Sequence, residues 1–288
     1  MKGIELQHVV RFLAFTFALS WLVMAVIIGK GGVQFAGLWI LLVMWVPGLV
    51  SLCYRKVYGI GFRDVGWRLG PIRYAAIAFF VPFIVAGLSY AVLWGTGISE
   101  FNPPSNAVLT RNGVGSSLEL ILKTYPVIFL IGCFAALGEE LGWRGFLIPK
   151  LYDTSLRYPL IVSSLIWGVW HFPLILWGGY ASSSLPLVSI LLFTVIILAS
   201  GVFVGWLRIQ SGSVWVAMVY HASHNLFLQT AFEVFNKPGP RSEFLGGESG
   251  VIPCAVYFLV LGTGWRLVKV KAKWKNRACA ADTESQTH

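Results

Sequence analysis

Long apolar runs separated by short polar segments dominate the hydrophobic pattern of the chain. At roughly 20 residues each, these runs are long enough to cross the hydrocarbon core of a bilayer as helices. No run alternates as a strand would, and lipid offers no partners for backbone N–H and C=O groups, so every span should be helical. The predicted spans are 9–29, 35–54, 74–98, 122–148, 158–178, 185–207, 213–233 and 251–268.

Two runs leave the number of spans open, because the fourth is the least regular and the eighth is short. The alternative is seven spans plus a surface helix. The longest connecting segments, 99–117 and 236–250, are rich in Pro and Gly and leave no room for a soluble domain. The sequence therefore predicts an all-α, polytopic transmembrane helical bundle of about eight spans. It forms a single domain over 1–268, with a motif-bearing core at 120–230 and a disordered, basic cytoplasmic tail over 269–288.

Composition and charge point to the same class of protein. Of 288 residues, 57% are hydrophobic and 12% are charged, about half the charged fraction of an ordinary soluble domain. The net charge of +10 is spread between apolar runs and in the tail, which argues against a nucleic-acid partner and for contact with the lipid bilayer. We expect an integral multi-pass membrane protein, located in the cell membrane if the source is prokaryotic. The run 9–29 is too long for the apolar core of a signal peptide, so we interpret it as a first membrane span that is not cleaved off.

The distribution of Lys and Arg predicts the orientation of the bundle. With eight spans and both termini in the cytoplasm, 17 of the 22 Lys and Arg residues lie on the cytoplasmic side and five on the other. Cytoplasmic loops of membrane proteins carry an excess of Lys and Arg. Cytoplasmic termini are therefore expected.

A small group of polar residues interrupts the apolar runs. Charged and polar side chains inside a bilayer are costly and usually face the bundle interior or a wet cavity. Counted at about 1.5 Å per residue from the predicted cytoplasmic ends of their helices, Glu139, His171, His221 and Asn225 lie ~12–18 Å deep. This similar depth predicts one shared site, formed by these four residues, with a cavity open to the cytoplasm. The other ionisable residues within the runs are Glu140, Arg144 and His224.

The spacing of these polar residues along the sequence indicates which of them share a helix face. His221 and Asn225 are four residues apart, as are Glu140 and Arg144, so each pair shares a helix face. Glu140 and Arg144 suit a supporting ion pair, whereas His224 faces away from His221 and reads as a packing residue. Gly138, Gly142 and Gly145 would allow a neighbouring helix to approach closely.

The residues of the shared site suit peptide hydrolysis. A carboxylate beside a histidine can activate water as a general base, and a second histidine with an amide can donate to an oxyanion. Such a site needs no cofactor. The alternative is a zinc enzyme with Glu139, His171 and His221 as ligands, although the neutral amide of Asn225 is a weak zinc ligand. Neither HExxH nor G-x-S-x-G occurs in the sequence, so other hydrolase motifs are not indicated.

Three short motifs resemble those of the CPBP family, which includes CAAX prenyl endopeptidases of the Ras-converting type and bacterial Abi or immunity relatives. "EELGWRG" (139–145) resembles the EExxxR motif, "WGVWHFP" (167–173) the (F/W)xxxH motif and "HASHN" (221–225) the HxxxN motif. They occur in family order, each on its own apolar run, so the resemblance covers roughly 120–230.

The resemblance implies an intramembrane endopeptidase that cleaves a membrane-associated protein or peptide, such as a prenylated CAAX tail. By it, Glu139 and His171 would activate the water, His221 and Asn225 would form the oxyanion hole, and Glu140 and Arg144 would support them. A non-enzymatic immunity or scaffold protein of the same fold is the competing interpretation. A transporter is disfavoured, because the chain lacks two similar halves.

Overall fold

The computed structural model describes residues 2–103, 117, 120–181, 186–237 and 239–261, and within them the regular elements are helical. The exception is an isolated antiparallel bridge between Phe101 and Asn236. The predicted all-α fold is therefore confirmed over the described residues. The tail predicted over 269–288 lies outside them.

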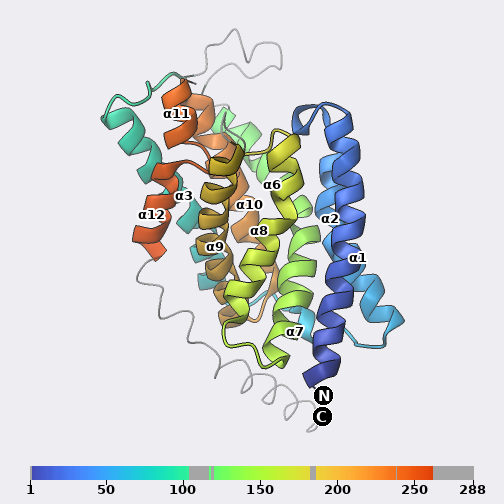
Figure 1. The fold of residues 1–288 in the computed structure, drawn as a ribbon. Helices are drawn as coiled ribbons and strands as arrows, with labels where there is room; N and C mark the ends of the chain where they lie inside the picture. Colours follow the sequence, from blue (N-terminus) through green and yellow to red (C-terminus); the bar gives the residue numbers. More distant parts are fainter. Residues whose placement is uncertain (1, 104–116, 118–119, 182–185, 238, 262–288) are drawn as a thin grey trace.

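The main helices follow the predicted runs and alternate in direction through the bundle (Figure 1). They are α1 (Lys2–Gly29), α2 (Leu38–Val57), α3 (Ile72–Gly95), α6 (Tyr125–Gly142), α8 (Pro159–Trp177), α9 (Pro186–Ser211), α10 (Val214–Leu226) and α12 (Val251–Leu261). Six helical segments in the described residues are long and apolar enough to cross a membrane; α10 and the described part of α12 are shorter. The chain is thus an integral membrane protein.

Short helical segments extend or join these helices. Three of them are π-helical: η4 (Leu120–Thr124), η5 (Trp143–Leu147) and η6 (Phe227–Ala231). With α7 (Ile148–Asp153), the first two lengthen α6 into one segment over 120–153, which extends beyond the predicted fourth span of 122–148 at both ends. The remaining short segments are η1 (Val33–Phe35), η2 (Arg63–Val65), η7 (Glu233–Phe235) and α11 (Pro240–Leu245).

The two ends of the bundle are each tied together by connecting segments. At the end that holds the start of α1, the N-terminal end, the Val214 backbone N–H donates to Gly66 and the Trp215 indole donates to Trp67. At the opposite or far end, the Val33 backbone N–H donates to the carbonyl of Gly178. Figure 1 shows α7 at the N-terminal end and α11 at the far end.

Close packing of α2 against α6 fixes the helix that carries the paired glutamates. A methyl group added at Gly138 would lie 2.7 Å from the Cα of Trp45, and one at Gly142 would lie 2.5 Å from the Cβ of Pro47. Only glycine fits at such distances, as the sequence predicts for these two positions. Gly145 has more room, because the nearest atom, in the side chain of Val65, is 3.3 Å away.

We expect Gly138→Ala to destabilise the protein, because α2 would have to move away from α6. Overpacking of this kind costs about 1–3 kcal/mol, and it should lower the midpoint of thermal unfolding in detergent. Gly95→Ala is the matched control, since nothing lies within 4 Å of the added methyl group. Equal melting temperatures for the two variants would contradict the close-packing argument.

Candidate active site

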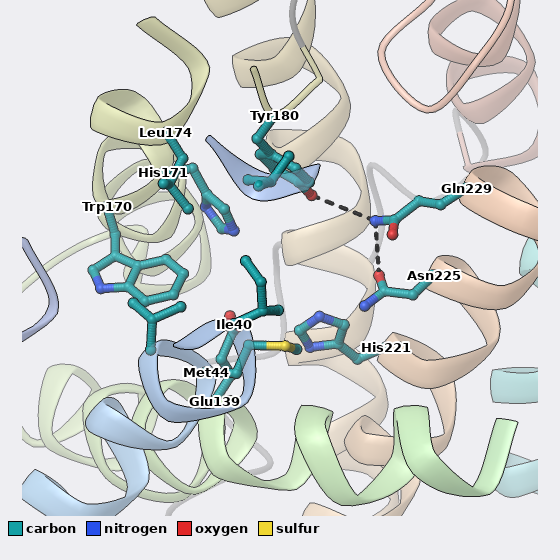
Figure 2. A pocket seen from close by; sticks show the side chains of 12 residues that line it. Ile40, Met44, Glu139, Trp170, His171, Leu174, Tyr180, His221, Asn225 and Gln229 are labelled. Atoms are coloured by element: carbon teal, nitrogen blue, oxygen red, sulfur yellow. Dashed lines mark hydrogen bonds between the residues drawn. The ribbon is translucent and has the colours of Figure 1, made fainter. Parts of the chain in front are cut away.

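A cavity of about 270 Å³ lies between α2, α6, α8 and α10, and all four predicted catalytic residues line it. Figure 2 shows Glu139 on α6, His171 on α8, and His221 with Asn225 on α10 around this space. The other lining residues are mostly apolar or aromatic: Val33, Ile40, Val43, Met44, Trp170, Leu174, Tyr180 and Gln229. The structure therefore brings together residues that are up to 86 positions apart (139 to 225).

Two tryptophan indoles hold the Glu139 side chain. The Trp167 Nε1–H donates to Oε2 at 2.8 Å, and the Trp143 Nε1–H donates to the same oxygen at 3.3 Å. Glu139 is only 2% exposed, so these donors offset part of the cost of burying a carboxylate. Because both donors bind Oε2, Oε1 is the oxygen left for a group in the cavity.

The His171 ring is oriented by its own helix. Its Nδ1 lies 2.8 Å from the backbone carbonyl of Trp167, one turn earlier. A carbonyl oxygen can only accept, so Nδ1 carries the proton and Nε2 is the acceptor of the neutral ring. The ring also stacks on Tyr180, with centroids 5.7 Å apart and an interplanar angle of 22°. His171 can thus accept a proton at Nε2.

Glu140 lies behind the cavity and connects two helices. Its Oε1 accepts from Arg144 at 2.8 Å, which is the ion pair that the sequence predicts, and also from the Nδ1 of His221 on α10 at 2.8 Å. Glu140 is fully buried, and the Arg144 guanidinium packs 4.1 Å from the centre of the Trp167 ring. Glu140 is therefore more than the partner of Arg144, because it also orients a candidate catalytic ring.

Sequence reasoning missed the contact between Glu140 and His221. Equal spacing on one helix points to Arg144 as the partner of Glu140, but no local pattern identifies a partner 81 residues away on another helix. Depth along the helices puts both residues at a similar level but does not indicate which side chains touch.

Gln229 extends the polar face of α10 by one more turn. Its Nε2 donates to the Oδ1 of Asn225 at 3.3 Å and to the hydroxyl of Tyr180 at 3.4 Å. Because Oδ1 of Asn225 is engaged, its amide nitrogen is the group left to donate (Figure 2). The four-residue spacing from His221 to Asn225 to Gln229 is a signal in the sequence that could have identified Gln229.

A buried polar cluster adjoins the cavity at the far end. Glu248 accepts from the Tyr180 hydroxyl at 3.2 Å and from the Nε2 of His224 at 3.1 Å. Burial alone would raise the pKa of Glu248, but the hydrogen bond from His224 and further polar contacts outweigh it and hold the pKa below its ordinary value. Burial and the Glu248 carboxylate raise the pKa of Tyr180 well above its usual range, so the phenol keeps its proton.

The same cluster accounts for His224. Its Nδ1 lies 2.7 Å from the Tyr257 hydroxyl on α12, and its other nitrogen contacts Glu248. His224 does not line the cavity, in agreement with its interpretation as a packing residue. Tyr180 and Glu248 lie in connecting segments without a motif, so nothing in the sequence marks them as residues of the site.

Irregular helix geometry accompanies the site on two helices. The π-helical turn η5 begins four residues after Glu139, and η6 begins two residues after Asn225. Such turns are rare and occur often at functional sites, because they change the direction in which side chains point. The helical segments that carry Glu139 and Asn225 therefore depart locally from ideal α-helical geometry.

The described residues do not form the cluster of His and carboxylate ligands that a zinc site would need. Within the described ranges, no group of three or more His, Cys, Asp or Glu side chains is placed to hold a metal ion. Glu139 is engaged by indoles and His221 by Glu140 through Nδ1.

The cavity reaches toward the far end of the bundle. Val33, Tyr180 and Gln229, which we call the mouth of the cavity, belong to the connecting segments at that end. No residue of 58–71, η5, α7 or 212–213, which lie toward the N-terminal end, lines the cavity. The sequence predicts cytoplasmic termini and a cavity open to the cytoplasm; in this fold the start of α1 and the mouth of the cavity lie at opposite ends of the bundle.

Comparison with known proteins identifies a related family over the part of the chain that carries the site. Residues 121–227 match the family model described as "Type II CAAX prenyl endopeptidase Rce1-like". The chain is also 35% identical over 151 residues to CAAX prenyl protease 2 of Methanococcus maripaludis. That similarity covers 50% of this chain and 50% of the relative, so about half the length of each protein is matched.

We expect Arg144→Ala to lower the stability of the protein together with any activity. The substitution leaves the fully buried Glu140 carboxylate without its cation, and breaking a buried pair from one side costs about 3–5 kcal/mol. The measurement is thermal unfolding in detergent, with Arg157→Ala as the control because Arg157 is exposed. Unchanged stability with lost turnover would instead place Arg144 among the groups that act on the substrate.

Proposed function

We propose that this chain, whose residues 121–227 match the Rce1-like CAAX prenyl endopeptidase family model, is an intramembrane endopeptidase. It hydrolyses a peptide bond of a membrane-associated protein or peptide. The observation that carries the proposal is the single cavity in which one carboxylate, two imidazoles and one amide meet among apolar helices. Polar groups inside a membrane protein are energetically costly, so a cluster of them usually marks a functional site.

Glu139 and His171 activate the attacking water in this proposal. With Oε2 held by two indoles, Oε1 of Glu139 is positioned to accept a hydrogen bond from water. His171 offers Nε2 as a second acceptor, because Nδ1 is engaged by the backbone. As the water oxygen bonds to the peptide carbonyl carbon, its proton passes to this pair. The proton then moves to the leaving nitrogen as the C–N bond breaks.

His221 and Asn225 stabilise the oxyanion that forms on the carbonyl oxygen. The amide nitrogen of Asn225 is available because its Oδ1 accepts from Gln229. His221 gives its Nδ1–H to Glu140, so it donates through Nε2 only when the ring holds both protons. In that state the charges of Glu139, Glu140, Arg144 and His221 sum to zero, which suits a site removed from water.

Glu139→Gln should remove hydrolysis while the protein still folds. An amide of the same size cannot accept the proton from water, and loss of general-base action typically reduces rates by about 10²–10⁴-fold. The assay compares cleavage profiles of the membrane proteome, and then purified protein on an identified substrate, between wild type and variant.

Glu100→Gln is the matched control for this experiment. Glu100 is exposed and pairs with Lys237 away from the cavity, so its turnover should equal that of the wild type. Near-normal cleavage by Glu139→Gln would refute the assignment of the base. A wild type that cleaves nothing would favour the scaffold interpretation.

The last test here separates water activation by protein groups from activation by zinc. Asn225→Ala should reduce turnover by about 10²–10³-fold, because one oxyanion donor is lost, with little change in substrate affinity. Metal analysis of active, detergent-purified protein should find no stoichiometric zinc, and chelators should leave activity intact. One tightly bound zinc per active chain, required for turnover, would overturn the metal-free mechanism.

A further inference from the structure

A chain of hydrogen bonds leads from a buried carboxylate outside the three motifs to the amide of Asn225. The Tyr180 hydroxyl donates to the Oε1 of Glu248 at 3.2 Å, and the amide nitrogen of Gln229 donates to that hydroxyl at 3.4 Å. The same nitrogen donates to the Oδ1 of Asn225 at 3.3 Å. Figure 2 shows the two contacts that join Tyr180, Gln229 and Asn225 beside the cavity.

Two members of this chain are amides, and an amide can lie in either of two orientations. The oxygen and the NH2 group of a side-chain amide have nearly the same shape, but the oxygen accepts hydrogen bonds and the NH2 group donates them. If the amide of Asn225 were turned over, its oxygen would face the cavity and repel an oxyanion. A role for Asn225 as an oxyanion donor therefore requires a group elsewhere that selects one orientation.

Glu248 supplies this selection. An ionised carboxylate accepts hydrogen bonds and cannot donate them, so the Tyr180 hydroxyl has to donate to Glu248. Its one proton is then used, and its oxygen can only accept from Gln229. Gln229 must turn its NH2 group toward Tyr180, and the same NH2 group faces the Oδ1 of Asn225. The NH2 group of Asn225 is what remains for the cavity.

The surroundings of Glu248 keep it ionised. Its side chain is 8% exposed, and the Nε2 of His224 lies 3.1 Å from its Oε1. Burial alone would raise the pKa of Glu248, but hydrogen bonds, first from His224 and then from Gln229, hold the pKa below its ordinary value. The neutral His224 ring can donate through Nε2 because its Nδ1 can accept from the Tyr257 hydroxyl. His224 thus acts on the chain through Glu248.

We propose that Glu248, acting through Tyr180 and Gln229, is a positioning residue that holds the amide of Asn225 with its NH2 group toward the cavity. This inference rests on the proposed function, since it concerns the oxyanion donor of the same site. Tyr180 has a second contact with the site, because its ring stacks on His171. The orientation of a motif residue is thus set by residues outside the motifs.

Gln229→Glu tests the direction of the chain, because it replaces the donor that faces Asn225 with an acceptor of the same shape. Asn225 then has to donate to the new carboxylate and turn its oxygen toward the cavity. Turnover should fall toward that of Asn225→Ala, by about 10²–10³-fold, with little change in KM, because an oxyanion donor acts in the transition state. Gln229 is exposed, so the variant should fold. The assay is run at about pH 8, where an exposed carboxylate is ionised.

Two further single variants calibrate this result. Gln229→Met removes both the donor and the acceptor at similar length. Without selection, about half of the molecules keep the productive orientation, so kcat should fall about two-fold. Gln34→Glu is the control for added charge, because Gln34 is exposed in η1 at the same end of the bundle and does not line the cavity. Its kcat should equal that of the wild type.

A double variant separates the orientation of the amide from a general effect of charge. In a chain that already carries Asn225→Ala, Gln229→Glu should cause no further loss of kcat, because the group that it turns is absent. A loss as large as in the wild-type background would overturn the positioning role. A KM that rises in step with the fall in kcat would also overturn it, since that result indicates a distorted cavity.

Glu248→Gln tests the origin of the selection. The new amide can donate to the Tyr180 oxygen, so the direction of the chain is no longer imposed and kcat should fall by about two-fold or more. Tyr180→Phe, which keeps the ring that stacks on His171, should cause a similar loss. The two changes together should cost no more than either alone, because both break the same chain. Wild-type kcat in Glu248→Gln would overturn the proposal.

The outcomes also separate this inference from the proposed function. Glu139-dependent cleavage with wild-type kcat in Gln229→Glu would overturn the positioning of Asn225 and leave the endopeptidase standing. A wild type without Glu139-dependent cleavage would reject the endopeptidase, and thermal unfolding in detergent then decides about the chain. The losses of stability in Tyr180→Phe and Gln229→Met should be less than additive in the double variant. Additive losses would overturn the hydrogen-bond chain itself.

Discussion

The position of the Glu140 carboxylate is the constraint on which the site depends. One oxygen of Glu140 accepts from Arg144 on its own helical segment and from His221 on α10. This single buried atom therefore links α6 to α10 and pairs the Glu140 carboxylate with the Arg144 cation. In a low-dielectric interior a carboxylate is tolerated only with such partners. Any movement of α10 relative to α6 would break the contact with His221. The His221 ring, a candidate catalytic group, is therefore held in place by the same interaction that offsets the cost of burying the charge.

A second set of contacts orients Glu139 and His171, the pair proposed to activate water. Trp167 donates through its indole to Glu139, and its backbone carbonyl accepts from His171, so one residue sets the orientation of both groups. Its ring also faces the Arg144 guanidinium. This explains in physical terms why an aromatic residue one turn before the histidine belongs to the motif. Here the indole adds a donor that a phenylalanine could not provide.

The sequence predicts the helices well because each span must satisfy its own backbone in lipid, which leaves a long apolar run as the mark of every helix. It also predicts four of the polar residues that line the cavity, Glu139, His171, His221 and Asn225, since few polar groups occur within the runs. It does not predict Tyr180 or Glu248, which lie in connecting segments whose positions depend on tertiary contacts such as Tyr180 with Glu248. The contact of Glu140 with His221 likewise depends on how two helices are rotated about their axes.

The depth of the polar groups along their helices does not by itself identify the side of the membrane on which the cavity opens. Rise per residue places His171 ~18 Å from the start of α8, and the same arithmetic places it nearer to the other end of that helix. Depth from one end cannot identify the open side, because the path to water depends on which side chains fill the helix interfaces. Toward the N-terminal end, those interfaces hold large buried groups such as Trp143, Phe146 and Arg55. Toward the far end, Gln229 and Tyr180 border open space. Packing, which is not visible in the periodicity of the sequence, therefore determines from which membrane face the polar groups can be reached.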